Sequence, residues 1–221
     1  CIASASVTIT EPPTLTASVR ANPILCNGGG ATITVSATGG TPQYTGTGTF
    51  TKGAGTYFFT VTDANGCADS LTIEITEPAE LVLSETHVDV TCNGESDGSI
   101  DMTIAGGTAP YSIDWDNNGT GQINDPEDLG SLAAGTYKVT VTDANSCTET
   151  LQVEITSPSE IIITSTQTDV DCNGNSTGSI DASVSGGVGP YTYQWDDTGS
   201  STTEDIIGLS AGIYNVTVTD N

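Results

Sequence analysis

Six cysteines and three prolines recur at fixed distances along the chain, and this frame limits the possible folds more than any other feature. A spacing of 66 residues separates Pro12 and Pro78, Cys1 and Cys67, and Cys26 and Cys92. A spacing of 80 residues separates Pro78 and Pro158, Cys67 and Cys147, and Cys92 and Cys172. Self-similarity at such periods indicates tandem copies of one structural unit. We therefore predict four segments: residues 1–11, the last strand of a preceding repeat; 12–77, a short repeat; 78–157, a full repeat; and 158–221, a repeat that stops before its last strand.

Within each repeat the apolar residues alternate with polar ones, which is the pattern of half-buried β-strands. Tyr137, Val139 and Val141 share one face, for example, and no stretch shows a sustained helical period. About seven short strands in roughly 75 residues, with Trp115 on the third strand, are typical of an immunoglobulin-like sandwich. The fold class predicted is all-β, with tandem immunoglobulin-like (PKD-like or fibronectin-III-like) sandwiches. Short proline-containing junctions favour an elongated rod.

Two local features refine this prediction. A tyrosine follows the Gly-x or Gly-Thr pair at the start of one strand in every repeat, at Tyr57, Tyr137 and Tyr214. This position suits the tyrosine corner of immunoglobulin-like domains. Repeat 12–77 is 14 residues shorter than repeat 78–157 and has no tryptophan. We therefore expect it to lack a strand or a hairpin from its middle.

The charge balance excludes several classes of partner. Three basic residues stand against 28 acidic ones, for a formal net charge of -25. Nucleic acids are bound largely through Lys and Arg, so nucleic-acid binding is excluded. No run reaches the 18 to 20 apolar residues of a membrane span, so direct membrane insertion is not expected either. Acidity of this kind keeps an extracellular rod soluble and self-repelling.

Cysteines that recur at fixed spacings, with no Cys-x-x-Cys motif, indicate disulfides formed in an oxidising compartment. Their pairing stays open at this point, with three alternatives. Pairing inside a repeat joins Cys26 to Cys67 and Cys92 to Cys147. The constant 25-residue spacing instead joins Cys1 to Cys26, Cys67 to Cys92 and Cys147 to Cys172. A third arrangement links one repeat's first turn to the last hairpin of the next, Cys26 to Cys147.

One loop has the composition of a calcium site. Ca²⁺ binds six to eight oxygens, and alternating acidic and amide side chains around a glycine turn can supply them. Asp114, Asp116, Asn118 and Asp125 stand near positions 1, 3, 5 and 12 of such a loop. The competing interpretation is an ordinary solvated acidic loop. Calcium is the one cofactor that the sequence suggests, and none is required.

Repeat 78–157 resembles the SprB-type repeat of very large surface adhesins of Bacteroidetes. Repeat 158–221 matches as well as far as it runs, and repeat 12–77 matches at its two ends only. The resemblance rests on Asp89-Val-Thr-Cys-Asn-Gly94, Asp97-Gly-Ser-Ile100, Gly106-Gly107, Pro110-Tyr111, Trp115 and Gly135-Thr-Tyr137 through Cys147. It implies export by type IX secretion, display at the outer membrane and a connection with gliding motility. It also implies, as partners, neighbouring repeats, the secretion and anchoring machinery, and an external surface or polysaccharide. Asp69-Ser70-Leu71 is similar to the short O-glycosylation motif of this phylum, which makes Ser70 a candidate site.

No phosphate loop, catalytic triad or acid/base pair occurs in a recognisable frame, so we predict that the chain is not an enzyme. The leading functional prediction is a stalk or adhesive repeat region of a secreted surface protein. The alternatives are a carbohydrate-binding module and spacer repeats attached to a secreted enzyme. A binding module predicts exposed aromatic side chains on one repeat that the other repeats lack.

Overall fold

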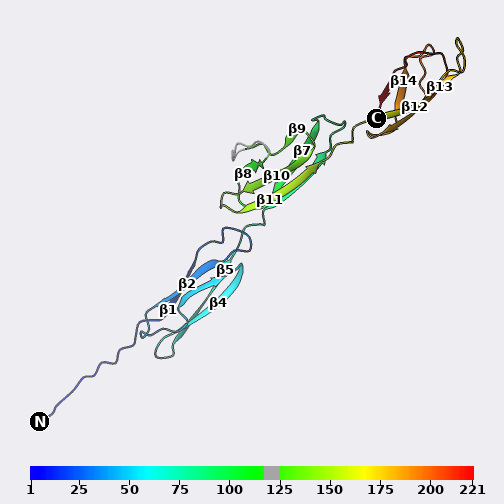
Figure 1. Cartoon of the computed structure of the whole chain (residues 1–221). Coiled ribbons are helices and arrows are strands. Elements are labelled where there is room, and N and C mark those ends of the chain that lie inside the picture. The colour runs from blue at the N-terminus through cyan, green and yellow to red at the C-terminus, as the bar shows by residue number, and fades with distance from the viewer. Residues whose placement is uncertain (117–124) are drawn as a thin grey trace. The chain divides into compact units, whose positions relative to one another are not determined.

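The computed structural model describes residues 1–116 and 125–221. In this part of the chain there are strands and no α-helix (Figure 1), which confirms the all-β prediction. No described helix is therefore long and apolar enough to cross a membrane. The strands form six small antiparallel sheets. The finer immunoglobulin-like arrangement and the repeat boundaries stay predictions.

Residues 12–77 contain five strands in two sheets. The first sheet has the order β1-β2-β3, and the second pairs β4 with β5. Their bounds are β1 Thr16–Ala21, β2 Ala31–Thr38, β3 Gly48–Lys52, β4 Gly55–Thr62 and β5 Ala68–Ile75.

Residues 78–157 contain six described strands, one more than residues 12–77 and one fewer than the seven predicted. The sheet orders are β6-β7-β9 and β11-β10-β8. The bounds are β6 Val82–Val88, β7 Gly98–Ala105, β8 Ser112–Trp115, β9 Leu129–Leu132, β10 Gly135–Thr142 and β11 Thr148–Ile155. In the shorter repeat an isolated β-bridge between Thr45 and Thr62 occupies the position at which β8 pairs with β10 in residues 78–157. The shorter repeat has thus lost a strand from its middle.

Residues 158–221 again contain five described strands. One sheet has the order β12-β13-β15, and the other pairs β14 with β16. The bounds are β12 Ile162–Thr168, β13 Gly178–Ser185, β14 Thr192–Trp195, β15 Ile206–Leu209 and β16 Val216–Thr219.

By its internal contacts the chain separates into two compact units. Unit 1 comprises Cys1–Ser84, Thr103–Asp125 and Val139–Leu151; unit 2 comprises Glu85–Met102, Pro126–Lys138 and Gln152–Asn221. The alternating strands put their apolar faces inside each unit. In unit 1 one core cluster consists of Ile24, Ala31, Ile33, Val35, Val61 and Ile75. In unit 2 one consists of Ala182, Trp195, Ile206 and Leu209.

The three predicted corner tyrosines make the same hydrogen bond. Each hydroxyl donates to the backbone carbonyl four residues earlier: Tyr57 to Gly53 at 3.1 Å, Tyr137 to Ala133 at 2.9 Å, and Tyr214 to Ser210 at 2.9 Å. This is the type of bond that a tyrosine corner makes. In the first two repeats it ties the start of β4 or β10 to the loop before it, and in the third Tyr214 lies two residues before β16.

A glycine pair recurs where the chain passes close to its own backbone. Gly106 has φ of +71°, and a Cβ built there would lie 1.7 Å from the Glu80 carbonyl oxygen. The next amide, of Gly107, donates to the Ala79 carbonyl at 2.9 Å. Only glycine fits such a conformation and such an approach.

We expect Gly106→Ala to destabilise the fold by more than about 2 kcal/mol, since it adds a steric clash to left-handed backbone strain. Gly130→Ala is the matched control, because a Cβ at Gly130 meets no atom within 4 Å. The control should change stability by less than about 0.5 kcal/mol. Urea denaturation followed by circular dichroism measures both, and equal losses would contradict the prediction.

Candidate functional site

A disulfide bond joins Cys26 to Cys147 across 121 residues of sequence. Cys26 lies in the loop between β1 and β2, and Cys147 ends the turn between β10 and β11. Both residues belong to unit 1, and their Cα atoms are 5.7 Å apart. Because Cys26 lies in residues 12–77 and Cys147 in residues 78–157, the bond links two successive repeats. Closing so long a loop contributes about 5 kcal/mol in the chain-entropy model.

Asp143 organises the hairpin side of this junction. Its side chain is buried, and Oδ1 accepts the amides of Asn145 at 2.8 Å and Cys147 at 2.9 Å. Oδ2 accepts the Thr108 amide at 2.9 Å. An aspartate that bonds the backbone two residues ahead forms an Asx-turn, a standard way to reverse a chain. The turn therefore holds Cys147 in place through a carboxylate that satisfies three amides.

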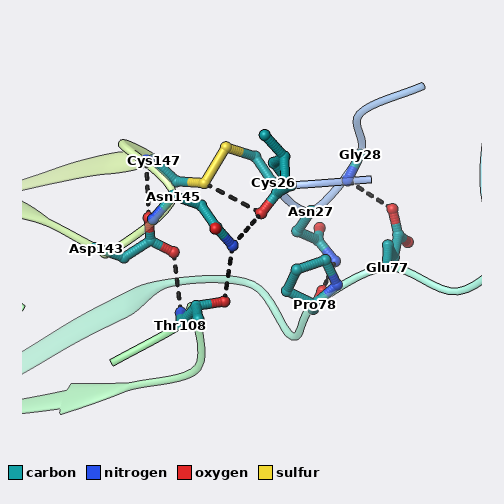
Figure 2. The surroundings of a disulfide bond; sticks show 10 residues. Cys26, Asn27, Gly28, Glu77, Pro78, Thr108, Asp143, Asn145 and Cys147 are labelled. Carbon is teal, nitrogen blue, oxygen red and sulfur yellow. Dashed lines mark hydrogen bonds between the residues drawn. A yellow bond between two sulfur atoms is a disulfide. The ribbon is translucent and has the colours of Figure 1, made fainter. Parts of the chain in front are cut away.

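Asn145 connects the hairpin to the loop that carries Cys26 (Figure 2). Its Nδ2 donates to the Leu25 carbonyl at 3.0 Å and to Thr108 Oγ1 at 3.0 Å. Leu25 immediately precedes Cys26, so this bond lies directly beside the disulfide. The disulfide and the hydrogen bond from Asn145 to Leu25 together hold the hairpin against the loop.

The loop side of the junction is fixed to the linker between the repeats. Asn27 Nδ2 donates to the Pro78 carbonyl at 3.0 Å, and the Gly28 amide donates to Glu77 Oε2 at 2.8 Å (Figure 2). Glu77 and Pro78 follow the end of β5. Peptide linker, disulfide and side-chain hydrogen bonds therefore all meet at one junction.

Equivalent hydrogen bonds occur beside two cysteines that form no disulfide, Cys92 and Cys67. In unit 2, Asn93 Nδ2 donates to the Pro158 carbonyl at 3.0 Å, which repeats the contact of Asn27, and Cys92 stands beside it as Cys26 does. In unit 1, Asp63 accepts the amides of Asn65 and Cys67, each at 2.9 Å, which repeats the turn of Asp143. Four cysteines are free and exposed: Cys1, Cys67, Cys92 and Cys172.

The structure has the third of the three cysteine pairings considered from the sequence, and not pairing within a repeat. The reason is visible in unit 1. The Asp69 carboxylate, near Cys67, accepts a hydrogen bond from the backbone amide of Ala17, the second residue of β1. The Gly28 amide, near Cys26, donates instead to Glu77, which lies beyond the far end of β5. Eight residues of β5 lie between, and they span about 27 Å. Cysteines more than about 7 Å apart between Cα atoms cannot be bridged.

The candidate calcium residues are brought together only in part. Asp125 Oδ2 accepts the Trp115 amide at 2.8 Å, so this carboxylate closes the end of β8. Asp114 lies in β8 and Asp116 directly follows it. Asn118 lies outside the described residues. Across residues 1–116 and 125–221 no three acidic, histidine or cysteine side chains gather as a metal-binding group. Calcium binding stays a prediction, as does glycosylation of Ser70, which is exposed on β5.

The role of the turn aspartates was not anticipated from the sequence, although its signal was present. The string Thr-Asp-Ala-Asn-x-Cys occurs at both Asp63 and Asp143. An aspartate at the end of a strand, with asparagine two residues later, is typical of an Asx-turn. From the sequence this string marks the repeat and a turn between two strands, and the part played by the aspartate side chain is seen only in the structure.

The pKa values of both turn aspartates lie below the usual range. The backbone amide of Thr41 is the main cause for Asp63, with those of Cys67 and Asn65 adding to it. For Asp143, burial raises the pKa, but the amides of Cys147, Thr108 and Asn145 together outweigh it. A carboxyl whose pKa is lower folded than unfolded stabilises the fold above its unfolded pKa of about 3.9. That contribution is lost as the pH falls through the folded pKa.

We therefore expect the free energy of unfolding to fall as the pH drops below about 4, and Asp143→Asn to reduce this fall. At pH 7 the variant should be less stable than the native chain, because an amide cannot accept from Thr108 and Cys147 together. Urea titrations at pH 7 and pH 3 measure both effects. Asp101→Asn, at an exposed position of β7, is the control and should leave both values unchanged. If the free energy of unfolding of Asp143→Asn fell between pH 7 and pH 3 by as much as that of the native chain, the expectation would be contradicted.

Comparison with known protein families identifies two segments of the chain. The SprB repeat family model matches residues 84–120 and residues 164–200. These segments start in β6 and in β12, and each includes the loop that carries Cys92 or Cys172 and the following strands to the tryptophan. No curated protein matches the chain. The resemblance drawn from the sequence is thereby confirmed: the SprB repeat model matches the chain at two places, 80 residues apart.

Proposed function

We propose that the chain is a load-bearing repeat region of a secreted bacterial surface adhesin. The observation that carries the proposal is the covalent junction between successive repeats, at Cys26 and Cys147. A disulfide supports an oxidising, extracellular setting. SprB repeats support the class of surface protein. In this proposal the repeats form a stiff stalk, and the parent protein serves attachment or gliding.

The partners proposed are neighbouring repeats of the same chain, the secretion and anchoring machinery, and an external surface or polysaccharide. The net charge of -25 supports a solvated stalk that repels its neighbours on a crowded cell surface. The proposal assigns no catalysis to the chain.

The proposal is tested on bacteria that carry the parent gene. Antibodies raised against residues 1–221 should label intact cells, and an in-frame deletion of this region should lower the shear at which cells detach. A replacement of the region by an unrelated sandwich array of equal length separates the stalk role from a specific adhesive role. Labelling that requires cell lysis, or unchanged detachment after deletion, would contradict the proposal.

The second candidate, a carbohydrate-binding module, has one observation in its favour. Phe58 on β4 is 68% exposed, and the equivalent positions of the other repeats hold Lys138 and Asn215. The tryptophans that could stack on sugars, Trp115 and Trp195, are buried. A single exposed aromatic side chain is common on soluble proteins and forms no binding face alone. A glycan array probed with the native chain and with Phe58→Ala tests this candidate, which requires binding that the variant loses.

A further inference from the structure

Strand β4 has an open edge, because the shorter repeat lacks the strand that would lie beside it. In residues 78–157 strand β10 lies between β11 and β8, whereas its counterpart β4 pairs only with β5 among the described strands (Figure 1). On the other side of β4, a bridge between Thr45 and Thr62 covers one end of the strand. Gly46 covers Thr60, since a Cβ built at Gly46 would lie 2.0 Å from the Thr60 carbonyl oxygen. No described strand covers the rest of this edge.

Two residues of β4 direct their backbone groups to the uncovered part of this edge. Thr62 exchanges two hydrogen bonds with Thr45, at 3.0 Å for its amide and at 2.8 Å for its carbonyl. Backbone groups along a strand alternate between its two sides, so those of Phe58 and Thr56 also point away from β5. In the third repeat the carbonyl equivalent to that of Phe58, in Asn215, accepts a backbone amide from the adjacent segment at 3.0 Å. In the shorter repeat no described strand lies there to pair with Phe58 and Thr56.

All three phenylalanines of the chain lie in this repeat, two of them in β4. Phe59 and Phe50 pack against the core and against each other, with ring centroids 5.1 Å apart. Phe59 stands where Val139 lies in the next repeat, opposite the buried Trp115. The ring pair therefore supplies aromatic packing to the core although the strand with the tryptophan is absent. Phe58, on the outer face, is 68% exposed.

Strand β4 also lacks the features with which natural proteins protect an open edge. Such edges usually carry charged side chains, prolines or bulges. Its sequence, Gly-Thr-Tyr-Phe-Phe-Thr-Val-Thr, has no charge and no proline, and it pairs with β5 without a register shift. After the glycine it consists only of aromatic and β-branched residues, the types that favour strands. The edge therefore offers another strand both free backbone groups and an apolar side chain, that of Phe58.

The charge distribution favours a second copy of this chain as the partner. Residues 12–62 contain Arg20, Lys52 and no acidic residue, whereas Glu11 and the 27 acidic residues after position 62 make up the total of 28. Two copies that meet at β4 therefore face each other with a segment free of negative charge. Elsewhere the net charge of -25 keeps copies apart, so the contact is confined to this repeat. An open edge is also complementary to itself, because two antiparallel strands present the same groups to each other.

The nearest acidic side chains do not prevent this approach. Glu74 of β5 lies opposite Thr56 in the register of β4 with β5. With the two β4 strands paired, the β5 strands that carry Glu74 are three strand spacings apart, about 14 Å. This distance exceeds the screening length of about 8 Å at physiological ionic strength. Added salt screens the remaining repulsion further, so the association should strengthen as the ionic strength rises.

We propose that two copies of this chain pair edge to edge through β4, so that their sheets join in the order β5-β4-β4-β5. The two β4 strands run antiparallel about a twofold axis, with Thr56 of each copy opposite Phe58 of the other. Each of these two residue pairs exchanges two backbone hydrogen bonds, which uses all the uncovered groups of Thr56 and Phe58. Because the contact is isologous and consumes the edge, the association stops at a dimer. Addition of a strand to a sheet edge is a recurrent mode of recognition.

This register also gives Phe58 an apolar neighbour. Each Phe58 lies on the outer face directly across from Thr56 of the other copy, a cross-strand pair of an aromatic and a β-branched residue. The two Phe58 side chains are diagonal neighbours at about 7–8 Å, within reach of aromatic rings. The dimer thus covers the side chain that is most exposed among the phenylalanines.

The full chain is tested by sedimentation equilibrium after its free thiols are blocked with iodoacetamide, so that disulfides between copies do not contribute. The thiols to be blocked are those of Cys1, Cys67, Cys92 and Cys172. We expect a monomer of 22.4 kDa and a dimer of twice that mass. The proportion of dimer should rise with protein concentration and with ionic strength.

Two lysine variants separate the edge from the rest of the repeat. Phe58→Lys should weaken the association at least about tenfold, because it removes the aromatic contact and places like charges close together across the strands. Thr34→Lys adds the same charge at an exposed position of β2, in the other sheet, and should leave the association unchanged. Retention of the Cys26–Cys147 bond in a non-reducing peptide map shows that each variant has folded.

Hydrogen exchange followed by NMR tests the strand pairing itself. The amides of Thr56 and Phe58 should exchange fast in the monomer and become protected as the dimer forms. The amides of Tyr57 and Phe59 point to β5, so they should exchange slowly at every concentration. A contact made by side chains alone would not produce this alternation.

Three results would overturn the proposal: a 22.4 kDa monomer at every concentration, equal association of Phe58→Lys and Thr34→Lys, or association that leaves the Thr56 and Phe58 amides unprotected. An edge that accepts only a strand of another protein would give the first of these results. The measurements use the purified chain, whereas the adhesin role is tested on cells, so the two proposals fail separately.

Discussion

Pulled from its two ends, the oxidised chain is expected to extend about 400 Å less than the reduced chain. The disulfide between Cys26 and Cys147 closes a loop of sequence separation 121, and no force along the backbone can straighten that loop. Each residue of an extended chain spans at most about 3.3–3.6 Å, which sets the size of the difference. Since the chain has 221 residues, more than half of its possible extension is removed. Single-molecule force spectroscopy with and without a reductant measures the two contour lengths.

Two variants control this experiment. Cys26→Ser with Cys147→Ser should show the long extension with or without reductant. Cys67→Ser with Cys172→Ser removes two free thiols and should keep the short extension, because neither residue takes part in the bond. A native oxidised chain that extends as far as the reduced one would refute the role of the disulfide as a limit on extension.

Replacing Trp115 by alanine should cost about 3–5 kcal/mol, the usual loss for a buried aromatic side chain. Trp115 is 1% exposed and lies opposite Val139 in the register of β8 with β10. The repeat is small, so a cavity of this size removes much of its stability. Denaturant unfolding followed by circular dichroism measures the loss.

An aromatic residue outside the core provides the matched comparison. Phe58 is 68% exposed on β4, and Phe58→Ala should change stability by less than about 0.5 kcal/mol. Trp115→Phe should fall between the two, since it keeps part of the buried surface. If Trp115→Ala and Phe58→Ala have similar effects, the ring of Trp115 contributes nothing to the core.

The strands and their buried faces could be predicted because both signals are local. The alternation of Tyr137, Val139 and Val141 specifies a strand and its inner face, and both valines are fully buried. The frame of cysteines and prolines specifies where each copy starts. The lost strand of residues 12–77 followed from a difference in length and from the missing tryptophan.

The pairing of the cysteines could not be predicted in the same way. A spacing says how far apart two residues are along the chain, but not at which end of a sandwich each one lies. The hydrogen bonds of Ala17 with Asp69 and of Gly28 with Glu77 place Cys67 and Cys26 at opposite ends of β5. The turn aspartates were overlooked for a related reason: a carboxylate that accepts three amides is recognised from the fold around it.

The loop closed by Cys26 and Cys147 contains the linker at Glu77 and Pro78 and most of two repeats. A protease that cuts the backbone once between these cysteines produces two fragments that remain covalently joined. Exposed loop segments are the preferred sites of proteolytic cleavage. In this chain a single nick inside the loop leaves the connection between the two ends intact, so damage to one peptide bond does not sever the molecule.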